Sequence, residues 1–358
     1  MFRLEHHWYR ITPLHLILIP LSLVFRVLVA FRRVLYRDRI LASDQLLIPV
    51  IVVGNISVGG TGKTPLTLAL AQQLIALGWH PLIVSRGYKS ASQHPQQVEP
   101  GMTAQQAGDE PLLMARRNLC PVWVGKDRAA TARAALQAHP QCDVVLCDDG
   151  LQHYRLQRDV EIAVIDGARG LGNGWLLPAG PLREPVSRLQ TVDAVVVNVQ
   201  ARSPLPTPLP QAGEGANESL REFQFDGGAV APGQYEMRLD GTVFYNLLDP
   251  GLTATATDFH KPGNHAVAGI GHPQRYFQHL ETLGISFTPH AFPDHHPYSA
   301  TDLAFTDCDA VLLTEKDAVK CTAFADARYW VLRVDAQIDS ALTGLILRKI
   351  KSHGSQTA

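Results

Sequence analysis

Ser57-Val58-Gly59-Gly60-Thr61-Gly62-Lys63-Thr64 decides the fold, because this stretch follows an apolar run, Ile48 to Val53, and precedes a helical pattern. The order of strand, glycine-rich loop and helix is that of a P-loop. Backbone N–H groups of such a loop converge on phosphates, so residues 57–64 are expected to bind a nucleoside triphosphate. Lys63 would reach the β- and γ-phosphates, and Thr64 would offer its hydroxyl to Mg²⁺.

The loop departs from the usual pattern at Ser57, where glycine is expected. The mechanism is hardly affected, because Gly59, Gly60 and Gly62 keep the backbone open to phosphate oxygens. Pro65 falls in the first helical turn, where its missing N–H costs nothing. The stretch therefore still predicts a phosphate-binding loop.

Composition excludes several other classes of protein. The chain has 358 residues and a net charge of −1, which argues against a protein that coats nucleic acid, so no nucleic-acid partner is expected. Its five cysteines are odd in number and lack C-x-x-C spacing. This pattern indicates a reducing compartment, with neither a zinc site nor a disulfide framework.

The N-terminal segment indicates a membrane. Residues 11–31 are mostly Leu, Ile and Val, no small-x-small cleavage site follows them, and a basic flank of Arg32, Arg33, Arg37 and Arg39 comes next. A helix of this length could span a bilayer with its basic flank in the cytoplasm. It could also lie in the interface, because polar residues would share one face: His15, Ser22, Arg26, Arg33 and Arg37. A third possibility is a helix packed on the protein's own core.

Downstream, apolar strand-like runs alternate with helical stretches, which predicts an α/β fold with a parallel sheet covered on both faces. The expected strands of this P-loop NTPase-type core are residues 48–53, 81–85, 122–124, 144–147, 161–165 and 194–199.

Residues 201–217 are rich in proline and small polar residues and lack periodicity, so we expect a linker or insertion there. Strand and helix patterns resume afterwards and predict a second, smaller α/β lobe. A cleft between two lobes is the natural place for a site. The expected division is a membrane-associated helix at 1–40, a P-loop core at 41–200, a Pro-rich insertion or linker at 201–225 and the second lobe at 226–345.

Two adjacent carboxylates, Asp148 and Asp149, end the apolar run that starts at Val144. The acidic strand that supports Mg²⁺ in P-loop enzymes has this form, and the spacing allows it to lie beside the first strand. If the strand continues through both, they point to opposite sides, one toward the metal. The alternative is a pair of acidic residues that merely begin a loop.

Four further positions are weaker candidates. Asp109, in Gly108-Asp109-Glu110-Pro111, could be no more than a helix N-cap when taken alone. Asp294-His295-His296 could hold a metal, act as a general-base pair or lie in a solvated loop. Arg183 and Glu184 end a proline-rich loop; the arginine suits an anionic oxygen or an ordinary salt bridge. Arg86 follows a strand at an edge where open α/β sheets bind ligands.

These motifs together resemble the tetraacyldisaccharide 4′-kinase family of lipid A biosynthesis. The resemblance runs from the N-terminal helix nearly to the end of the chain. It rests on residues 54–65, 85–88, 108–111, 148–153 and 177–184, on Gly269-Ile270-Gly271, Asp294-His295 and Thr314-Glu315-Lys316-Asp317-Ala318.

The resemblance implies transfer of the ATP γ-phosphoryl group to the 4′-hydroxyl of tetraacyldisaccharide 1-phosphate, with Mg²⁺, at the cytoplasmic face of the inner membrane. The product would be lipid IV-A. The family's acceptor pair corresponds to Asp109 and His295 here, beside Lys63 as the third catalytic residue. The metal would be held through Thr64, Asp148 and Asp149. Arg183, Glu184 and Arg86 are assigned to the acylated disaccharide, and the N-terminal helix to membrane lipids.

The main rival is a P-loop GTPase or ATPase of the metal-insertion type, in which Asp294-His295-His296 would bind metal. A guanine-reading motif would support it, but Thr314-Glu315-Lys316-Asp317 has the right letters in the wrong spacing. A non-enzymatic membrane scaffold would leave the glycine loop and the acidic strand without a role.

Overall fold

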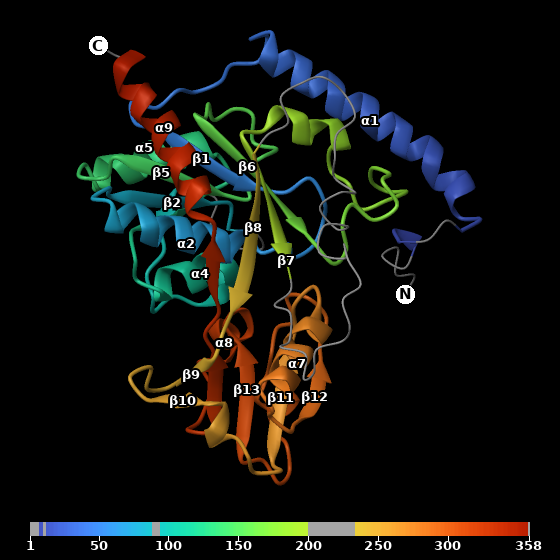
Figure 1. Ribbon diagram of the computed structural model, residues 1–358, viewed down its shortest axis with the longest axis vertical. Helices are drawn as coiled ribbons and strands as arrows, with labels where there is room; N and C mark the ends of the chain where they lie inside the picture. Colours follow the sequence, from blue (N-terminus) through green and yellow to red (C-terminus); the bar gives the residue numbers. More distant parts are fainter. Residues whose placement is uncertain (1–6, 10–11, 88–93, 200–232, 357–358) are drawn as a thin grey trace, which may run out of the picture.

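Two sheets organise the protein (Figure 1). The computed structural model describes residues 7–9, 12–87, 94–199 and 233–356. Within them the larger sheet has nine strands, in the order β15 (Asp335–Ile338), β8 (Gly233–Asp240), β7 (Ala194–Val199), β6 (Val160–Asp166), β1 (Val50–Gly54), β5 (Val144–Asp148), β2 (Pro81–Ser85), β4 (Val122–Val124) and β3 (Gln96–Gln97). Only the outermost pairings, β15 with β8 and β3 with β4, are antiparallel among these strands.

Strand β1 lies at the centre, between β5 and β6, and is parallel to both. Val53 pairs in register with Asp148, so the P-loop and the acidic pair leave the sheet at the same edge. The expected parallel α/β core, with the acidic strand beside the first strand, is confirmed. Side chains of β1 alternate between two cores, with Ile51 and Val53 in one and Val50 and Val52 in the other.

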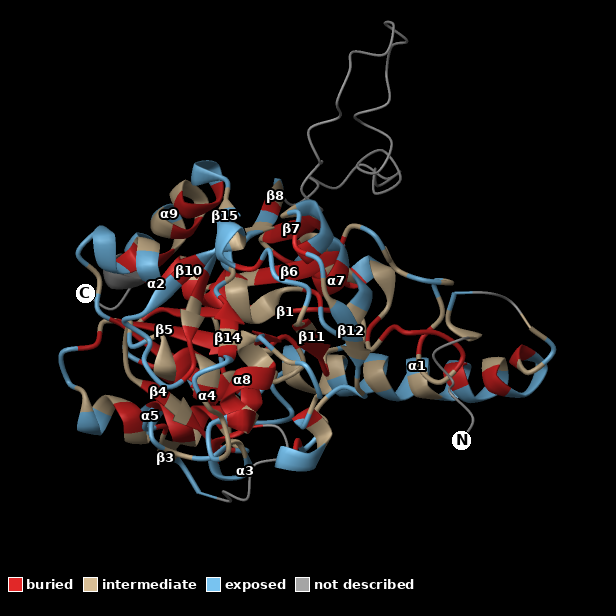
Figure 2. Cartoon of the chain, turned by 90° about the horizontal axis from the view of Figure 1, so that it is seen from below, coloured by how far each residue is buried: buried red, intermediate tan, exposed pale blue. Residues whose placement is uncertain are grey.

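Helices cover both faces of the larger sheet (Figures 1 and 2). The core that holds Ile51 also receives α2 (Lys63–Ala76), α4 (Asp109–Arg116) and α9 (Ser340–Gln356). The other face is covered by α5 (Arg128–Ala138), whose Ala129, Ala132 and Ala135 allow close approach to the strands. Full burial of an aliphatic side chain contributes about 1.5–3 kcal/mol, so these layers fix the central strands firmly.

The smaller sheet has six strands in the described residues, and it lies beyond one end of the larger sheet. Its order is β10 (Thr253–Thr255), β9 (Val243–Asn246), β14 (Tyr329–Leu332), β13 (Ala310–Thr314), β11 (Asn264–Ala268) and β12 (Thr288–Ala291). Helices α7 (Pro273–Thr282) and α8 (Glu315–Cys321) belong to this lobe; short helical turns include α3 (Ala104–Ala107), η2 (Val186–Thr191), η3 (Ala256–Asp258) and η4 (Ala300–Leu303).

The second lobe was expected to span residues 226–345, but parts of this range and the residues after it belong to the larger sheet and its core. Strand β8 extends the larger sheet beside β7, β15 pairs with β8, and α9 continues to Gln356 against the same core. Gly241 lies between β8 and β9, and a Cβ atom there would fall 2.6 Å from the carbonyl oxygen of Arg333. The expected insertion at 201–225 lies outside the described residues.

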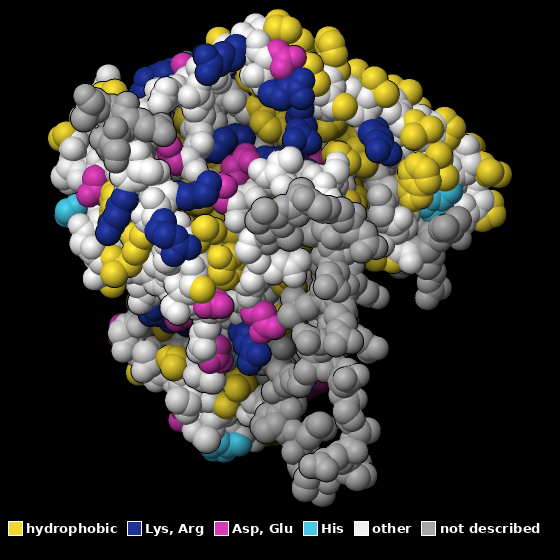
Figure 3. Space-filling model, turned by 45° about the horizontal axis from the view of Figure 1, so that its top comes forward, with side chains coloured by type: hydrophobic (Ala, Val, Ile, Leu, Met, Phe, Trp, Pro, Cys, Tyr) yellow, Lys and Arg dark blue, Asp and Glu magenta, His cyan; other side chains and the backbone are white. Residues whose placement is uncertain are grey.

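Helix α1 (His15–Arg37) buries only His15, Leu18 and Ser22 against the protein and leaves most of its length exposed (Figure 2). Apolar side chains gather along the edge of the molecule where α1 lies (Figure 3). His15 Nε2 donates to the carbonyl of Ala179 at 3.0 Å, and Ser22 Oγ donates to that of Leu176 at 2.8 Å. Most large apolar residues of the helix face outward instead: Leu16, Ile17, Leu21, Leu23, Val24, Val27, Leu28, Phe31 and Val34. By length and composition, α1 could cross a membrane.

Candidate active site

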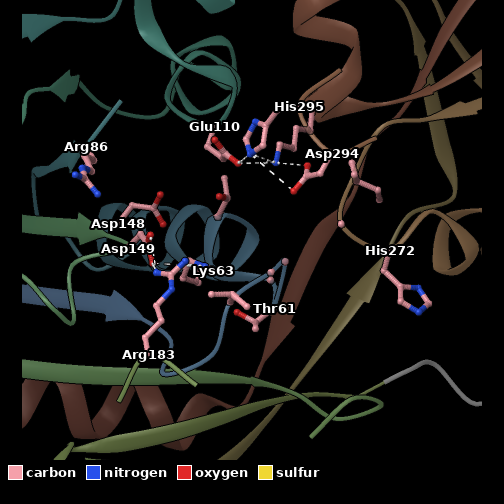
Figure 4. A pocket seen from close by; sticks show the side chains of 18 of the residues that line it. Thr61, Lys63, Arg86, Glu110, Asp148, Asp149, Arg183, His272, Asp294 and His295 are labelled. Carbon is pink, nitrogen blue, oxygen red and sulfur yellow. Dashed lines mark hydrogen bonds and ion pairs between the residues drawn. The ribbon is translucent and has the colours of Figure 1, made fainter. Parts of the chain in front are cut away.

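A cavity of about 1780 Å³ lies where the two lobes meet. The larger lobe contributes the P-loop, Asp148 and Asp149, and Arg183. The smaller lobe contributes residues at or after the ends of its strands: Gly271, His272, Asp294, His295, Thr314 and Lys316. The same cavity extends to Phe25, Leu28 and Val29 of α1. Figure 4 shows side chains from both lobes around the shared space.

The P-loop is held in place by residues that lie far away in the sequence. Asn198, on β7, donates to the carbonyl of Thr61 at 3.0 Å. Ser57 forms a β-bridge with Leu182, and Val58 N donates to the carbonyl of Pro181 at 2.8 Å. These contacts fix the path of the backbone, so its N–H groups can meet phosphates without a large rearrangement.

Two glycines of the loop adopt a backbone that other residues rarely accept. Gly59 and Gly62 have φ values of +101° and +98°. A Cβ atom at Gly62 would fall 2.7 Å from Asn198 Nδ2 and 2.8 Å from Met237 Cε. Glycine is therefore required at Gly62 for two independent reasons, its left-handed conformation and the close packing of β7 and β8.

A chain of charges joins the middle of the P-loop to the smaller lobe. Arg169 donates to the carbonyl of Gly60 and forms an ion pair with the buried Asp166 at 3.0 Å. Arg275, from α7, contacts the other oxygen of Asp166 at 2.9 Å. The orientation of the Gly60 peptide thus depends on residues from both lobes.

Lys63 and the acidic pair meet at the edge of the sheet. Strand β5 ends at Asp148, and Asp149 turns away from it with a φ of +48°. The strand therefore does not continue through both carboxylates. Lys63 Nζ lies 3.5 Å from Asp149 Oδ1, and Arg183 Nη1 lies 3.3 Å from both oxygens of Asp149. Burial would raise the pKa of Asp149, but these cations outweigh it and lower that pKa to about 2.

Asp148 has the opposite electrostatic environment. Burial, together with the charge of Asp149, raises the pKa of Asp148 to about 7. Thr64, Asp148 and Asp149 all line the cavity, and their hydroxyl and carboxylate oxygens are ligands that Mg²⁺ prefers. No group of three or more His, Cys, Asp or Glu in the described residues could hold a metal alone. The oxygens of Thr64, Asp148 and Asp149 fit a Mg²⁺ ion whose remaining ligands would come from nucleotide phosphates.

The three expected substrate residues lie in different surroundings. All three line the cavity, and Arg183 is ion-paired with Asp149. Glu184 is only 1% exposed, and its carboxylate accepts hydrogen bonds from Gln152 and Tyr154. Glu184 therefore serves to fix the loop that carries Arg183, whatever else it contacts.

Asp109 and His295 meet across the two lobes, 186 residues apart in the chain. His295 Nδ1 donates to Asp109 Oδ2 at 2.9 Å, and Lys316 Nζ lies 3.3 Å from His295 Nε2. Asp109 is the first residue of α4 and so does not cap it; Gly108 holds the cap position. Burial would raise the pKa of Asp109, but the His295 hydrogen bond and the Lys320 and Lys316 charges hold it below its ordinary value.

The two adjacent histidines have separate environments. His295 lines the cavity, whereas His296 packs its ring against Phe292 and Tyr298, with Nε2 3.5 Å from Asp302. The geometry therefore favours a pair formed by His295 with Asp109 over joint ligation of one metal by both histidines.

Several residues of this site carry no clear signal in the sequence. Asn198 and Met237 support the P-loop from β7 and β8, and Lys320 lies beside Asp109. Lys316 belongs to a motif that supported the family resemblance, but nothing in its spacing indicated a role. A lysine four residues after Lys316, on the same face of a helix, is the one signal that could have led to Lys320.

Known proteins resemble this chain in both sequence and fold. The family described as tetraacyldisaccharide-1-P 4′-kinase matches residues 14–351. The tetraacyldisaccharide 4′-kinase of Azoarcus sp. is 47% identical, over 98% of this chain and 96% of its own length. That of Methylobacillus flagellatus is 46% identical, over 97% and 95%. The crystal structure of the apo form of LpxK from Aquifex aeolicus in complex with ATP superimposes with a TM-score of 0.72, at 29% identity, over 93% of this chain and 98% of that one.

Replacement of Gly62 by alanine is expected to weaken ATP binding about tenfold or more, because a left-handed backbone costs an alanine about 1–2 kcal/mol and the packing clash adds to this. Isothermal titration calorimetry of Gly62→Ala would measure the dissociation constant. Gly101→Ala is the control, since a Cβ there meets nothing within 4 Å. Equal affinities in the two variants would contradict the role given to the loop geometry.

Proposed function

Because the chain belongs to the tetraacyldisaccharide 4′-kinase family, we propose how its own residues carry out that reaction. The protein is an ATP-dependent kinase that transfers the γ-phosphoryl group to the 4′-hydroxyl of tetraacyldisaccharide 1-phosphate in lipid A biosynthesis. One observation carries the assignment of residues: His295, which is hydrogen-bonded to Asp109 at 2.9 Å, lines the same interlobe cavity as the P-loop lysine. The metal-insertion alternative finds no comparable support.

The nucleotide half of the reaction is assigned to residues 57–64. Their N–H groups and the Lys63 ammonium would bind the triphosphate and stabilise the charge that spreads over the transferred group. Lys63 is paired with Asp149 at 3.5 Å, so the side chain is already directed toward the acidic edge of the sheet. Little reorientation is then needed when ATP binds.

Thr64 and Asp148 are the residues that we propose for Mg²⁺, with Asp149 beside them. Mg²⁺, when bound, neutralises charge on the β- and γ-phosphates. Both residues line the cavity, which supports this assignment, and a bound divalent cation would favour the ionised form of the buried Asp148 carboxylate. Asp149 keeps its two cationic partners, Lys63 and Arg183, and orients them toward the phosphates.

The acceptor half is assigned to Asp109 and His295. A sugar hydroxyl is a poor nucleophile, and a positioned base can take its proton as the phosphoryl group arrives. Lys316 lies on the Nε2 side of His295 and Asp109 on the Nδ1 side, a pattern that suits a neutral imidazole with its proton on Nδ1. The hydroxyl proton would pass to the pair formed by His295 and Asp109.

The substrate is an acylated lipid, and the cavity extends to α1 of the protein. We therefore assign Arg183 and Arg86 to anionic or polar groups of the disaccharide, with Glu184 fixing the Arg183 loop. We also propose that α1 attaches the enzyme to the cytoplasmic face of the inner membrane. Its two docked polar side chains, His15 and Ser22, and its exposed apolar residues support a helix that lies in the interface.

The assigned reaction predicts that labelled phosphate passes from γ-labelled ATP to tetraacyldisaccharide 1-phosphate in detergent micelles with Mg²⁺. Lys63→Ala should abolish the labelled lipid, because the γ-phosphate loses its main cationic partner. Lys349→Ala is the control, since Lys349 forms a surface ion pair with Asp193 and does not line the cavity. Release of free phosphate without labelled lipid would argue for a simple nucleotide hydrolase.

The acceptor pair predicts a second result. Asp109→Ala and His295→Ala should each lower kcat by about 10²- to 10⁴-fold and leave ATP affinity nearly unchanged. His296→Ala serves as the matched control, because its ring packs against Phe292 and Tyr298 instead. Steady-state kinetics with both substrates would separate the two effects. A large loss of ATP affinity would move Asp109 and His295 to the nucleotide site.

The membrane assignment predicts that the double variant Val27→Asp, Phe31→Asp binds phospholipid vesicles more than about tenfold less tightly, since two apolar side chains lose their burial. Val27 and Phe31 are 66% and 60% exposed. Leu47→Asp, at a position that is 89% exposed elsewhere on the surface, is the control. Vesicle co-sedimentation would measure the change, and equal binding of the two proteins would rule out α1 as the anchor.

A further inference from the structure

Helix α8 presents two lysines to the acceptor pair, and one of them has no role so far. Lys316 and Lys320 lie four residues apart, so both point from the same face of the helix. Lys316 lines the cavity and forms ion pairs with Glu110 at 2.7 Å and Asp294 at 3.1 Å. Lys320 is not among the residues that line the cavity.

Lys320 is a buried cation between two carboxylates. Its side chain is 6% exposed, and Nζ lies 2.8 Å from Asp317 Oδ1 and 3.8 Å from Asp109 Oδ2. Nζ also lies 4.9 Å from the centre of the Tyr298 ring, close enough for a cation–π contact. The ammonium is thus held by one carboxylate while it faces the other.

Asp317 is itself fixed firmly. It is fully buried and accepts hydrogen bonds from the backbone of Gly269 at 3.0 Å and from Thr314 Oγ1 at 2.6 Å. These partners hold Asp317 to the ends of β11 and β13. The position of the Lys320 ammonium is therefore set by the sheet of the smaller lobe, whereas Asp109 belongs to α4 of the larger lobe.

A buried charge network of this kind is weak as a source of stability, because well-packed apolar residues often serve as well or better. It is effective where a buried group must keep its charge. Asp109 is such a group, since a carboxylate removed from water favours its protonated form unless a cation faces it. Oδ2 of Asp109 receives both His295 and Lys320, so the two contacts fix the same oxygen.

We propose that Lys320 is a positioning residue for phosphoryl transfer: held by Asp317, its ammonium keeps the Asp109–His295 pair in the orientation and charge state that accepts the hydroxyl proton. This inference rests on the proposed function of that pair. The charge balance agrees with it. When the pair takes up the proton and loses its negative charge, the Lys320–Asp317 ion pair remains neutral overall, so the transfer creates no uncompensated buried charge.

Other charged groups also face the pair and must be included in any pH dependence. Glu110 lies beside Asp109 on α4, Asp294 precedes His295, and the remaining groups are Tyr298, Lys316 and Asp317. Burial would raise the pKa of Asp109, whereas the His295 hydrogen bond and the charge of Lys320, more than that of Lys316, lower it. Loss of the Lys320 cation therefore raises the pKa of Asp109, and its proton-accepting form is then lost at a higher pH as the solution is acidified.

The test is the pH profile of kcat/KM in Lys320→Met, which removes the charge and keeps most of the volume. We expect a loss of about tenfold or more at neutral pH and an acidic limb moved upward by about one pH unit. The KM for ATP should stay within about twofold of the wild-type value. Lys320→Arg keeps the charge and should restore most of the activity and the wild-type limb.

A second variant covers the case in which Lys320→Met does not fold, since Asp317 would be left buried without its cation. The double variant Asp317→Asn, Lys320→Met removes both charges and keeps an oxygen for Gly269 and Thr314. We expect it to fold, as judged by thermal melting, and to show the same upward shift of the acidic limb. Lys349→Met removes an ion-paired lysine elsewhere and should leave the limb unchanged.

Two outcomes would overturn the inference. An acidic limb at its wild-type position in a folded variant without Lys320 would reduce this residue to a structural role, and a large rise in KM for ATP would move it to the nucleotide site. Asp109→Ala, assayed in parallel, tests the proposed function of the acceptor pair itself. If Asp109→Ala keeps full transfer activity, the acceptor pair itself is misassigned and the role of Lys320 fails with it.

Discussion

The parallel pairing of β1 with β5 is the constraint on which the site depends. In a parallel sheet the carboxyl ends of adjacent strands lie at one edge, so the glycine loop after Val53 and the carboxylate of Asp148 emerge together. Arg128, buried on α5, donates to the carbonyl of Asp149 and holds the turn after β5. Lys63, Asp149 and Arg183 can then form one cluster. Without that register, a phosphate-binding loop and its acidic partner would be two unrelated features of the chain.

The second half of the chemistry comes from a different sheet. Asp109 begins a helix of the larger lobe, whereas His295, Lys316 and Lys320 belong to the smaller one. The chain crosses between the sheets after β8 and returns at β15, and Arg117 adds ion pairs to Glu315 and Asp335 at 2.8 and 2.7 Å. The placement of the acceptor pair is therefore a property of the contact between lobes, and neither lobe contains it alone.

Local sequence patterns predicted some of this structure, but they did not predict contacts between residues that are far apart in the chain. The P-loop and the acidic strand end were predictable because their chemistry is confined to a few adjacent residues. The membership of β8 and β15 in the larger sheet was not, since strand pairing depends on partners that no local period reveals. The meeting of Asp109 with His295 came only from the family resemblance. The burial of Glu184 and Lys320 was hidden for another reason: a charged residue on a loop or a short helix usually faces solvent.

Helix α1 is connected to the phosphate site through a single loop. Its His15 and Ser22 are hydrogen-bonded to Ala179 and Leu176, and a few residues later the same loop pairs Pro181 and Leu182 with the start of the P-loop. One short loop thus connects α1 to the P-loop, so a change in the position of α1 would alter the backbone that meets phosphate. If α1 lies in a membrane as proposed, the lipid or detergent around the enzyme would act on nucleotide binding through this loop.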